Sequence, residues 1–338
     1  MPTQNTPVSV VICAKNEAKN IQEFLPSILA QEYANFEIVL INDRSYDETA
    51  NLFEAFAEKH ANIKIVTIRE SEHFYGNKKY ALTLGIKAAT NDCLLFTDAD
   101  CKPVSKHWIT EMVGQYNNSS KEIVLGYGGY TTIKNSFLNK LIRYETLQTA
   151  IQYFSYAKLG IPYMGVGRNL CYSKALFLRN KGFNKYVKIL SGDDDLFINQ
   201  VATKTNSTSC YTTNAHTIST PKTTWAGWIY QKRRHISTAD YYQKKHQFLL
   251  GLFATNRLLF WVLLPLLPFL NYTSQELYIV LGLLASKFLT EWLVVGLAAK
   301  KLNEHKIALL APLLDFILLI AQLYIYKANL YSKPKTWS

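Results

Sequence analysis

The first hundred residues alternate between two hydrophobic patterns. Short runs of Val, Ile, Leu and Phe, typical of buried strands, lie at 8–13, 36–41, 63–68 and 93–97. Between these runs apolar residues recur every three or four positions, which gives a helix one apolar face. The clearest such face combines Ile21, Phe24, Leu25, Ile28 and Leu29. Strands and helices in alternation predict βαβ units and an α/β fold with a mostly parallel sheet.

Further helices are expected near 47–60 and 78–89, and Ser45 and Glu48 stand before the first of them at capping-box spacing. Beyond position 106 the pattern is mixed. It indicates a helix around Trp108, a strand near 123–130, a long helix near 135–158 and a helix near 194–204.

Three apolar segments close the chain, at 249–270, 277–299 and 307–326. Each approaches the roughly 20 residues that a helix needs to cross a bilayer. The first contains Pro265 and Pro268, so it either crosses the membrane or enters it as a re-entrant or interfacial segment. We therefore expect an integral membrane protein with two to three transmembrane helices.

The orientation of these segments follows from the positive charges that flank them. The link 271–276 has no Lys or Arg, whereas 300–306 has three, so the second link and the soluble region before the apolar segments are expected in the cytoplasm, at the inner or plasma membrane. Three full spans would nevertheless place Lys327, Lys333 and Lys335 outside, against the same rule. The sequence leaves this conflict open.

Composition and charge agree with a soluble region joined to a membrane anchor. Apolar residues make up 49% of the 338 positions and charged residues 18%, which is too apolar for a disordered chain and too charged for a wholly embedded one. The net charge of +12 concentrates beside the apolar segments, which favours an anionic membrane surface and phosphorylated substrates over nucleic acid. The five cysteines are dispersed, form no zinc motif and fit a reducing compartment.

Polar residues follow the predicted strands at the edge where α/β sheets bind ligands. Lys15-Asn16-Glu17 follows the first strand and Asp43 the second, which suits recognition of a base and ribose, although each is also an ordinary loop residue. Asp98 and Asp100 follow the fourth strand, and carboxylates two apart on a turn can hold Mg²⁺ or Mn²⁺ against a diphosphate. A surface loop carries the same pattern without a metal.

Two later clusters carry stronger charge. The run Gly192-Asp193-Asp194-Asp195 places three carboxylates together, which suits a cation or a proton transfer but also an exposed helix N-terminus. The run Gln231-Lys232-Arg233-Arg234-His235 can hold a diphosphate or form a basic patch at the membrane. Lys287, Glu291 and Asp315 lie inside apolar segments, where they either tie helices together or serve a function such as transport.

The order and spacing of these parts resemble the membrane-bound inverting glycosyltransferases of family 2, over residues 7–240. That family has a GT-A fold, a Rossmann-like domain, here followed by C-terminal membrane helices. The matching motifs are VSVVICAKNE at 8–17, IVLINDRS at 38–45, NKKYAL at 77–82, FTDAD at 96–100, SGDDDL at 191–196 and QKRRH at 231–235.

The resemblance implies a role for each motif. Uridine recognition is implied for Ala14, Glu17 and Asp43, and contact with the nucleotide-sugar for Lys78, where Asn77 replaces the usual glycine. The metal on the diphosphate is implied at Asp98 and Asp100. The catalytic base is implied to be Asp194, with Asp193 as the neighbouring alternative. Binding of the donor at the membrane-proximal motif is implied for Gln231 and Arg234. In this motif His235 takes the place of a tryptophan that normally stacks on the acceptor sugar.

These features predict a cytoplasmic catalytic domain at 1–230, an amphipathic interface segment at 231–248 and a membrane region at 249–338. The expected activity is metal-dependent transfer of a hexose or N-acetylhexosamine, with inversion, from a nucleotide-sugar, expected to be a UDP-sugar, to a lipid-linked or glycan acceptor of the cell envelope. One alternative is a processive polysaccharide synthase, which His235 disfavours. Others are an inactive membrane scaffold and a transporter. Nucleic-acid binding is not expected.

Overall fold

The computed structural model describes residues 6–69, 78–119, 121–332 and 334. Asn77, Lys333 and Lys335, which the sequence singles out, lie outside the described residues. The chain divides into two compact units, one formed mainly by Met1–Thr131 and Gln152–Pro221 and the other by Thr132–Ile151 and Lys222–Lys333.

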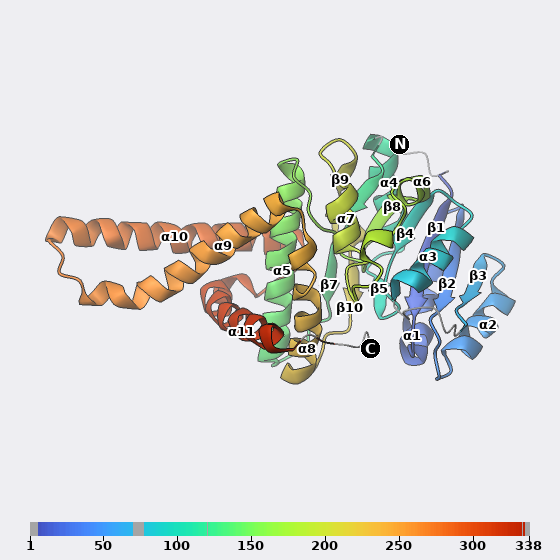
Figure 1. Ribbon diagram of the computed structural model, residues 1–338, viewed down its shortest axis with the longest axis horizontal. Helices are drawn as coiled ribbons and strands as arrows, with labels where there is room; N and C mark the ends of the chain where they lie inside the picture. The colour runs from blue at the N-terminus through green and yellow to red at the C-terminus, as the bar shows by residue number, and fades with distance from the viewer. Residues whose placement is uncertain (1–5, 70–77, 120, 333, 335–338) are drawn as a thin grey trace. The chain divides into compact units, whose positions relative to one another are not determined.

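The first unit is built on a seven-stranded sheet with the order β3-β2-β1-β4-β8-β6-β9 (Figure 1). Its strands are β1 (Val8–Ala14), β2 (Phe36–Asn42), β3 (Ile63–Thr67), β4 (Cys93–Phe96), β6 (Ile123–Leu125), β8 (Leu170–Ser173) and β9 (Ser207–Ser209). The first four are parallel, and β8 runs antiparallel to both of its neighbours. The predicted mostly parallel α/β sheet is therefore confirmed.

Helices connect the strands as the hydrophobic pattern predicts. Those of the first unit are α1 (Ala18–Leu29), α2 (Thr49–Lys59), α3 (Lys78–Ala88), α4 (Trp108–Ser119), α6 (Lys174–Arg179) and α7 (Asp195–Val201). The apolar face of α1 is buried through Ile21, Phe24, Leu25 and Ile28. The expected capping box before α2 is wrong, because Glu48 makes no side-chain cap and the Ser45 hydroxyl instead accepts a hydrogen bond from the Asn16 N–H at 3.0 Å.

The strand expected near 123–130 is two strands in different sheets. β6 belongs to the large sheet, whereas β7 (Gly128–Tyr130) joins β5 (Cys101–Pro103) and β10 (Thr217–Ser219) in a small one. The buried Asn169 side chain stabilises the break between β6 and β7. It donates to the carbonyl of Tyr127 at 2.8 Å and accepts from the Trp108 indole at 3.0 Å. A side chain at Gly126 would meet this amide at 2.5 Å, so the break requires glycine.

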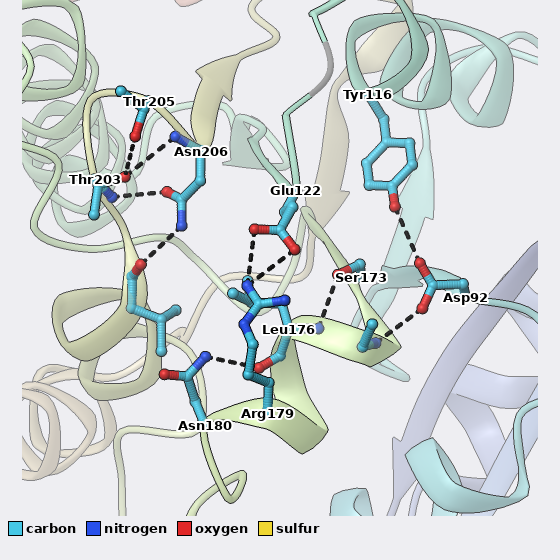
Figure 2. Close-up of polar contacts among 12 residues, drawn as sticks. Asp92, Tyr116, Glu122, Ser173, Leu176, Arg179, Asn180, Thr203, Thr205 and Asn206 are labelled. Carbon is cyan, nitrogen blue, oxygen red and sulfur yellow. Dashed lines mark hydrogen bonds and ion pairs between the residues drawn. The ribbon is translucent and has the colours of Figure 1, made fainter.

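Polar side chains near the starts of β4 and β6 form hydrogen bonds and an ion pair that stabilise the fold. Figure 2 shows the Arg179 guanidinium on both oxygens of Glu122, at 3.0 and 2.9 Å, beside the start of β6. Asp92, just before β4, accepts from the Tyr116 hydroxyl at 3.3 Å, and the Ser173 hydroxyl caps α6 (Figure 2). These groups satisfy one another and leave the opposite, carboxyl edge of the parallel strands for chemistry.

The second unit is helical. It contains the first part of α5 (Phe137–Lys158), then α8 (Trp225–Ile236), α9 (Lys244–Leu263), α10 (Ser274–Lys301) and α11 (Ala311–Tyr331). With short 3-10 turns at Leu264–Phe269 and Ala308–Leu310, three stretches among the described residues are long and apolar enough to cross a membrane, namely Lys244–Phe269, Ser274–Lys301 and Ala308–Tyr331. All three apolar segments of the sequence are thus candidate spans, including the proline-containing first one.

Candidate active site

The loops after β1 and β2 are joined to each other at the carboxyl edge of the sheet. The Asn16 amide oxygen accepts from the Tyr46 N–H at 2.8 Å, and the Glu17 N–H donates to the Thr49 hydroxyl at 2.9 Å. Asn16 has φ of 58°, a left-handed conformation that asparagine tolerates better than most residues. Hydrogen bonds therefore join two loops that are far apart in the sequence into one rim of the site.

Asp43 lies at this rim with one satisfied and one unsatisfied oxygen. Its side chain is 1% exposed, and its Oδ1 pairs with the Arg44 guanidinium at 2.8 Å. Its Oδ2 is buried and has no hydrogen-bond partner among the residues that the structure describes. The adjacent Ala14 carbonyl accepts the Asp43 N–H at 2.9 Å, so Ala14 and Asp43 lie together as expected. The free oxygen is an acceptor for an N–H or O–H donor of a ligand.

Lys78, the first residue of α3, connects two of the acidic motifs. Its Nζ lies 2.8 Å from Asp98 Oδ1 and 3.0 Å from Asp193 Oδ2. Burial opposes the charge on Lys78, but the two carboxylates outweigh it and raise the pKa of the amine well above its usual value. Burial likewise opposes ionisation of Asp193, but Lys78 and Lys79 hold its pKa below the ordinary one. Asp193 is therefore an anion in a salt bridge and a poor proton acceptor.

Asp98 and Asp100 form the candidate metal centre. Ligand atoms of Asp98, Asp100 and Cys101 lie within 4.8 Å of one another. Burial and the nearby Asp98 carboxylate raise the pKa of Asp100, so a cation between the two would relieve their repulsion. Burial also raises the pKa of the Cys101 thiol, which stays protonated and does not suit a hard cation. The residues fit Mg²⁺ or Mn²⁺ held by two carboxylates.

Asp194 lies near this centre and has a raised pKa. Its Oδ2 accepts the Gly167 N–H at 2.6 Å, and its Oδ1 accepts the Asp195 N–H at 2.7 Å at the start of α7. Burial, followed by the charges of Asp193 and Asp195, raises the pKa of Asp194 to about 7. A carboxyl group with this pKa can accept a proton near neutral pH.

A single pocket brings several of these groups together. Its lining includes Cys13, Lys78, Thr97, Asp98, Gly167, Tyr172, Asp193 and Asp194. The pocket thus brings Lys78, Asp98, Asp193 and Asp194 together, whereas Ala14, Glu17, Asp43 and Asp100 are not part of this lining. Gln231 and Arg234 lie on α8 in the second unit, and their part at the site stays a prediction.

Two cationic residues near the site were not identified from the sequence motifs. Lys79 is 1% exposed, and its Nζ donates to the carbonyls of Ile189, at 2.6 Å, and Ser191, so it holds the loop that leads to Asp194. The only sequence signal is its place beside Lys78 in the NKKYAL motif.

Arg168 is the second such residue. Its guanidinium lies 4.3 Å from the centre of the Tyr130 ring and donates to the carbonyl of Gly129 at 3.2 Å. Burial opposes its charge, but Tyr130, Cys101 and the two aspartates after β4 raise its pKa above the usual value. Its signal in the sequence is its position directly after Gly167 in a glycine-bearing turn.

Comparison with known proteins agrees with this geometry. Residues 9–184, just over half of the chain, match glycosyl transferase family 2. The chain belongs to this family. A family 2 relative, glycosyltransferase AglE of Haloferax volcanii, is 29% identical over 126 residues, which cover 37% of this chain and 40% of that protein. Poly-beta-1,6-N-acetyl-D-glucosamine synthase of Staphylococcus epidermidis is 34% identical over 93 residues, or 28% of this chain and 21% of the synthase.

The family 2 domain also has a known fold. The mannosyltransferase PcManGT of Pyrobaculum calidifontis, solved with GDP-Man and Mn²⁺, superposes with a TM-score of 0.58 at 18% identity. The match covers 98% of this chain and 88% of that one. This likeness establishes the GT-A fold. The two curated relatives match over less than half of their own length, so their substrates belong to those proteins alone.

Proposed function

We propose that this protein transfers a sugar from a nucleotide-sugar, expected to be a UDP-sugar, to a hydroxyl group of a lipid-linked or glycan acceptor at the cytoplasmic face of a membrane. The transfer inverts the anomeric carbon and depends on a divalent metal. The observation that carries the proposal is the position of Asp194, whose carboxyl group has a pKa of about 7 and lines the same pocket as Asp98 and Lys78.

The donor end of the site accounts for the polar groups at the rim. The unpaired Asp43 Oδ2 is a suitable acceptor for a donor group of the base or ribose, with Ala14 beside it and Glu17 on the same rim. Lys78 and the pair Asp98 and Asp100 would lie near the diphosphate. PcManGT was solved with a nucleotide-sugar and Mn²⁺, which supports this class of donor.

The reaction is a single displacement at the anomeric carbon. The acceptor oxygen forms the new glycosidic bond while the bond to the diphosphate oxygen breaks, and the hydroxyl proton passes to a carboxylate oxygen of Asp194. Asp193 is the weaker candidate for this base because its salt bridge with Lys78 keeps it ionised and lowers its basicity.

Charge on the leaving group needs its own stabilisation. A Mg²⁺ or Mn²⁺ ion held by Asp98 and Asp100 would neutralise the departing nucleoside diphosphate. Lys78 supplies a fixed positive charge beside Asp98, and we assign Gln231 and Arg234 to the diphosphate as well, since guanidinium groups bind such oxygens bidentately.

The experiment is a donor screen with detergent-purified full-length protein. UDP-, GDP- and dTDP-sugars are incubated with Mn²⁺ or Mg²⁺ and membrane lipid extract, and both nucleoside diphosphate release and products are measured. We expect release from UDP-sugars, loss of release with EDTA and products that carry one added sugar of inverted configuration. A ladder of products would show a processive synthase instead. No release from any donor would contradict the proposal and favour a scaffold.

A further inference from the structure

The last helix, α11, carries a polar stripe on one face and an apolar surface on the other. Asp315, Gln322 and Asn329 are spaced seven residues apart, so they lie on the same side of the helix. The other side exposes the apolar side chains of Leu313, Phe316, Ile320, Leu323 and Tyr324, and one charged side chain, Lys327, near the end of the helix. This amphipathic pattern differs from that of a helix surrounded by lipid.

The first two residues of the stripe, Asp315 and Gln322, contact α5 and α9. Asp315 Oδ1 accepts from the Gln148 amide of α5 at 2.9 Å and pairs with the Arg257 guanidinium of α9 at 2.8 Å. Its Oδ2 accepts from the Trp261 indole at 2.8 Å, and Arg257 also donates to Gln322 at 2.8 Å. Both oxygens of this carboxylate are therefore satisfied.

Both ends of α11 are attached to polar helices. Just before α11, Glu304 forms a buried ion pair of 2.6 Å with Arg143 of α5. At its other end, Asn329 accepts from the Arg233 guanidinium of α8 at 3.0 Å and donates to the Arg233 carbonyl at 2.8 Å. Arg233 also donates to the Ser332 hydroxyl at 2.9 Å, beyond the last turn.

The helices that receive these contacts are themselves joined. Lys232 of α8 pairs with Glu145 of α5 at 2.7 Å, with both side chains mostly buried. A path of polar contacts thus runs from Asp315 through α5 and α8 to Asn329, parallel to 14 residues, or about 21 Å, of α11. Because charged side chains are costly in hydrocarbon, α5 and α8 must stay at the aqueous boundary, and so must both ends of α11.

We propose that α11 lies along the membrane surface, with its apolar face in the lipid, and does not span the bilayer. The helices that cross the membrane are then α9 and α10. In their most apolar parts 0% and 6% of the residues are buried inside the protein, compared with 33% in α11. The arrangement does not depend on the proposed function. It places Lys300, Lys301, Lys306 and Lys327 on one side of the membrane, which resolves the conflict with the positive-inside rule.

The test uses single cysteines in the full-length protein and a membrane-impermeant maleimide on right-side-out and inside-out vesicles. His305→Cys and Tyr331→Cys mark the two ends of α11, and Asn271→Cys marks the turn between α9 and α10; all three positions are exposed. The wild-type chain is the control, since its five cysteines are buried. We expect positions 305 and 331 to react from the same face and position 271 from the opposite face.

Reaction of positions 305 and 331 from opposite faces would overturn the proposal, and reaction of position 271 from the face of position 305 would overturn the crossing by α9 and α10. A nitroxide at Ile320→Cys gives a second readout that needs no sidedness. It should lie within about 5–10 Å of the headgroup boundary, whereas a spanning helix would place it near the centre of a roughly 30 Å core. A label shielded from both oxygen and aqueous relaxant would indicate a protein partner and also overturn the proposal.

Discussion

The two units each bury a cluster of charged side chains, and the clusters differ in how well their charges are satisfied. In the catalytic unit, Lys78 bridges Asp98 and Asp193, while Asp194 lies beside them with a pKa raised to about 7. In the helical unit, Asp315 has partners for both oxygens, and Arg257 pairs with it.

This difference distinguishes a cluster suited to catalysis from a cluster that stabilises the packing of helices. Burial and nearby negative charges that raise the pKa of a carboxyl group toward neutral pH make its ionised form unfavourable. Binding of a proton or a cation then releases this free energy. A fully paired carboxylate has no such capacity and instead joins helices. Lys287 and Glu291 also pair, at 2.5 Å, and the lysine lies 4.2 Å from the Phe260 ring of the neighbouring helix, but Glu291 Oε1 is buried with no hydrogen-bond partner among the described residues.

The largest effect should follow from removing the proposed base. Asp194→Asn keeps the shape of the side chain but cannot accept the proton, so turnover should fall about 10²–10⁴-fold while donor binding is retained. Nucleoside diphosphate release and calorimetric donor binding measure the two quantities. Asp195→Asn is the matched control and should keep most of the turnover. Near-normal turnover of Asp194→Asn would disprove the assignment.

Substitutions in the Asp315 cluster should change the free energy of unfolding rather than the rate of the reaction. Asp315→Ala leaves Arg257 buried without its counterion, which should lower the free energy of unfolding by about 3–5 kcal/mol. Thermal unfolding in detergent measures the change. The double variant Asp315→Leu with Arg257→Leu removes both charges and should recover most of the loss. A double variant as unstable as the single one would show that the pair matters for more than mutual neutralisation.

Lys79 should act on turnover through the loop that it holds. Lys79→Met frees the carbonyls of Ile189 and Ser191, and a misplacement of Asp194 by about 1 Å can cost about 10²-fold in kcat. Donor KM should change little, and Lys79→Arg should restore part of the rate. Lys87→Met, at an exposed position of the same helix, is the control. An equal loss in both methionine variants would contradict a positioning role.

The smallest effect should appear in the pH profile. Below its pKa of about 7 Asp194 is protonated and cannot act as a base, so kcat should rise with pH up to about 7 and then level off. Asp195→Asn removes one of the charges that raise this pKa, so its acidic limb should move to lower pH. A profile that is the same in both proteins would show that another group controls the rate.

The sequence alone determined the order of strands and helices in the first hundred residues and the places of the acidic motifs. Strand and helix periodicities depend on neighbours along the chain, and the carboxyl ends of parallel strands share one edge, so Asp98 and the polar residues after β1 and β2 could be assigned to a common site. The apolar length of the three C-terminal segments was likewise readable.

Only the tertiary structure decided which carboxyl group titrates near neutrality, that Lys79 holds the loop before it, and that the 123–130 segment divides between two sheets around Asn169. It also decided that α11 turns a polar stripe toward α5 and α8. Burial and electrostatic potential at these positions come from residues distant in sequence, such as Lys78 beside Asp193, and a local pattern contains no information on such contacts.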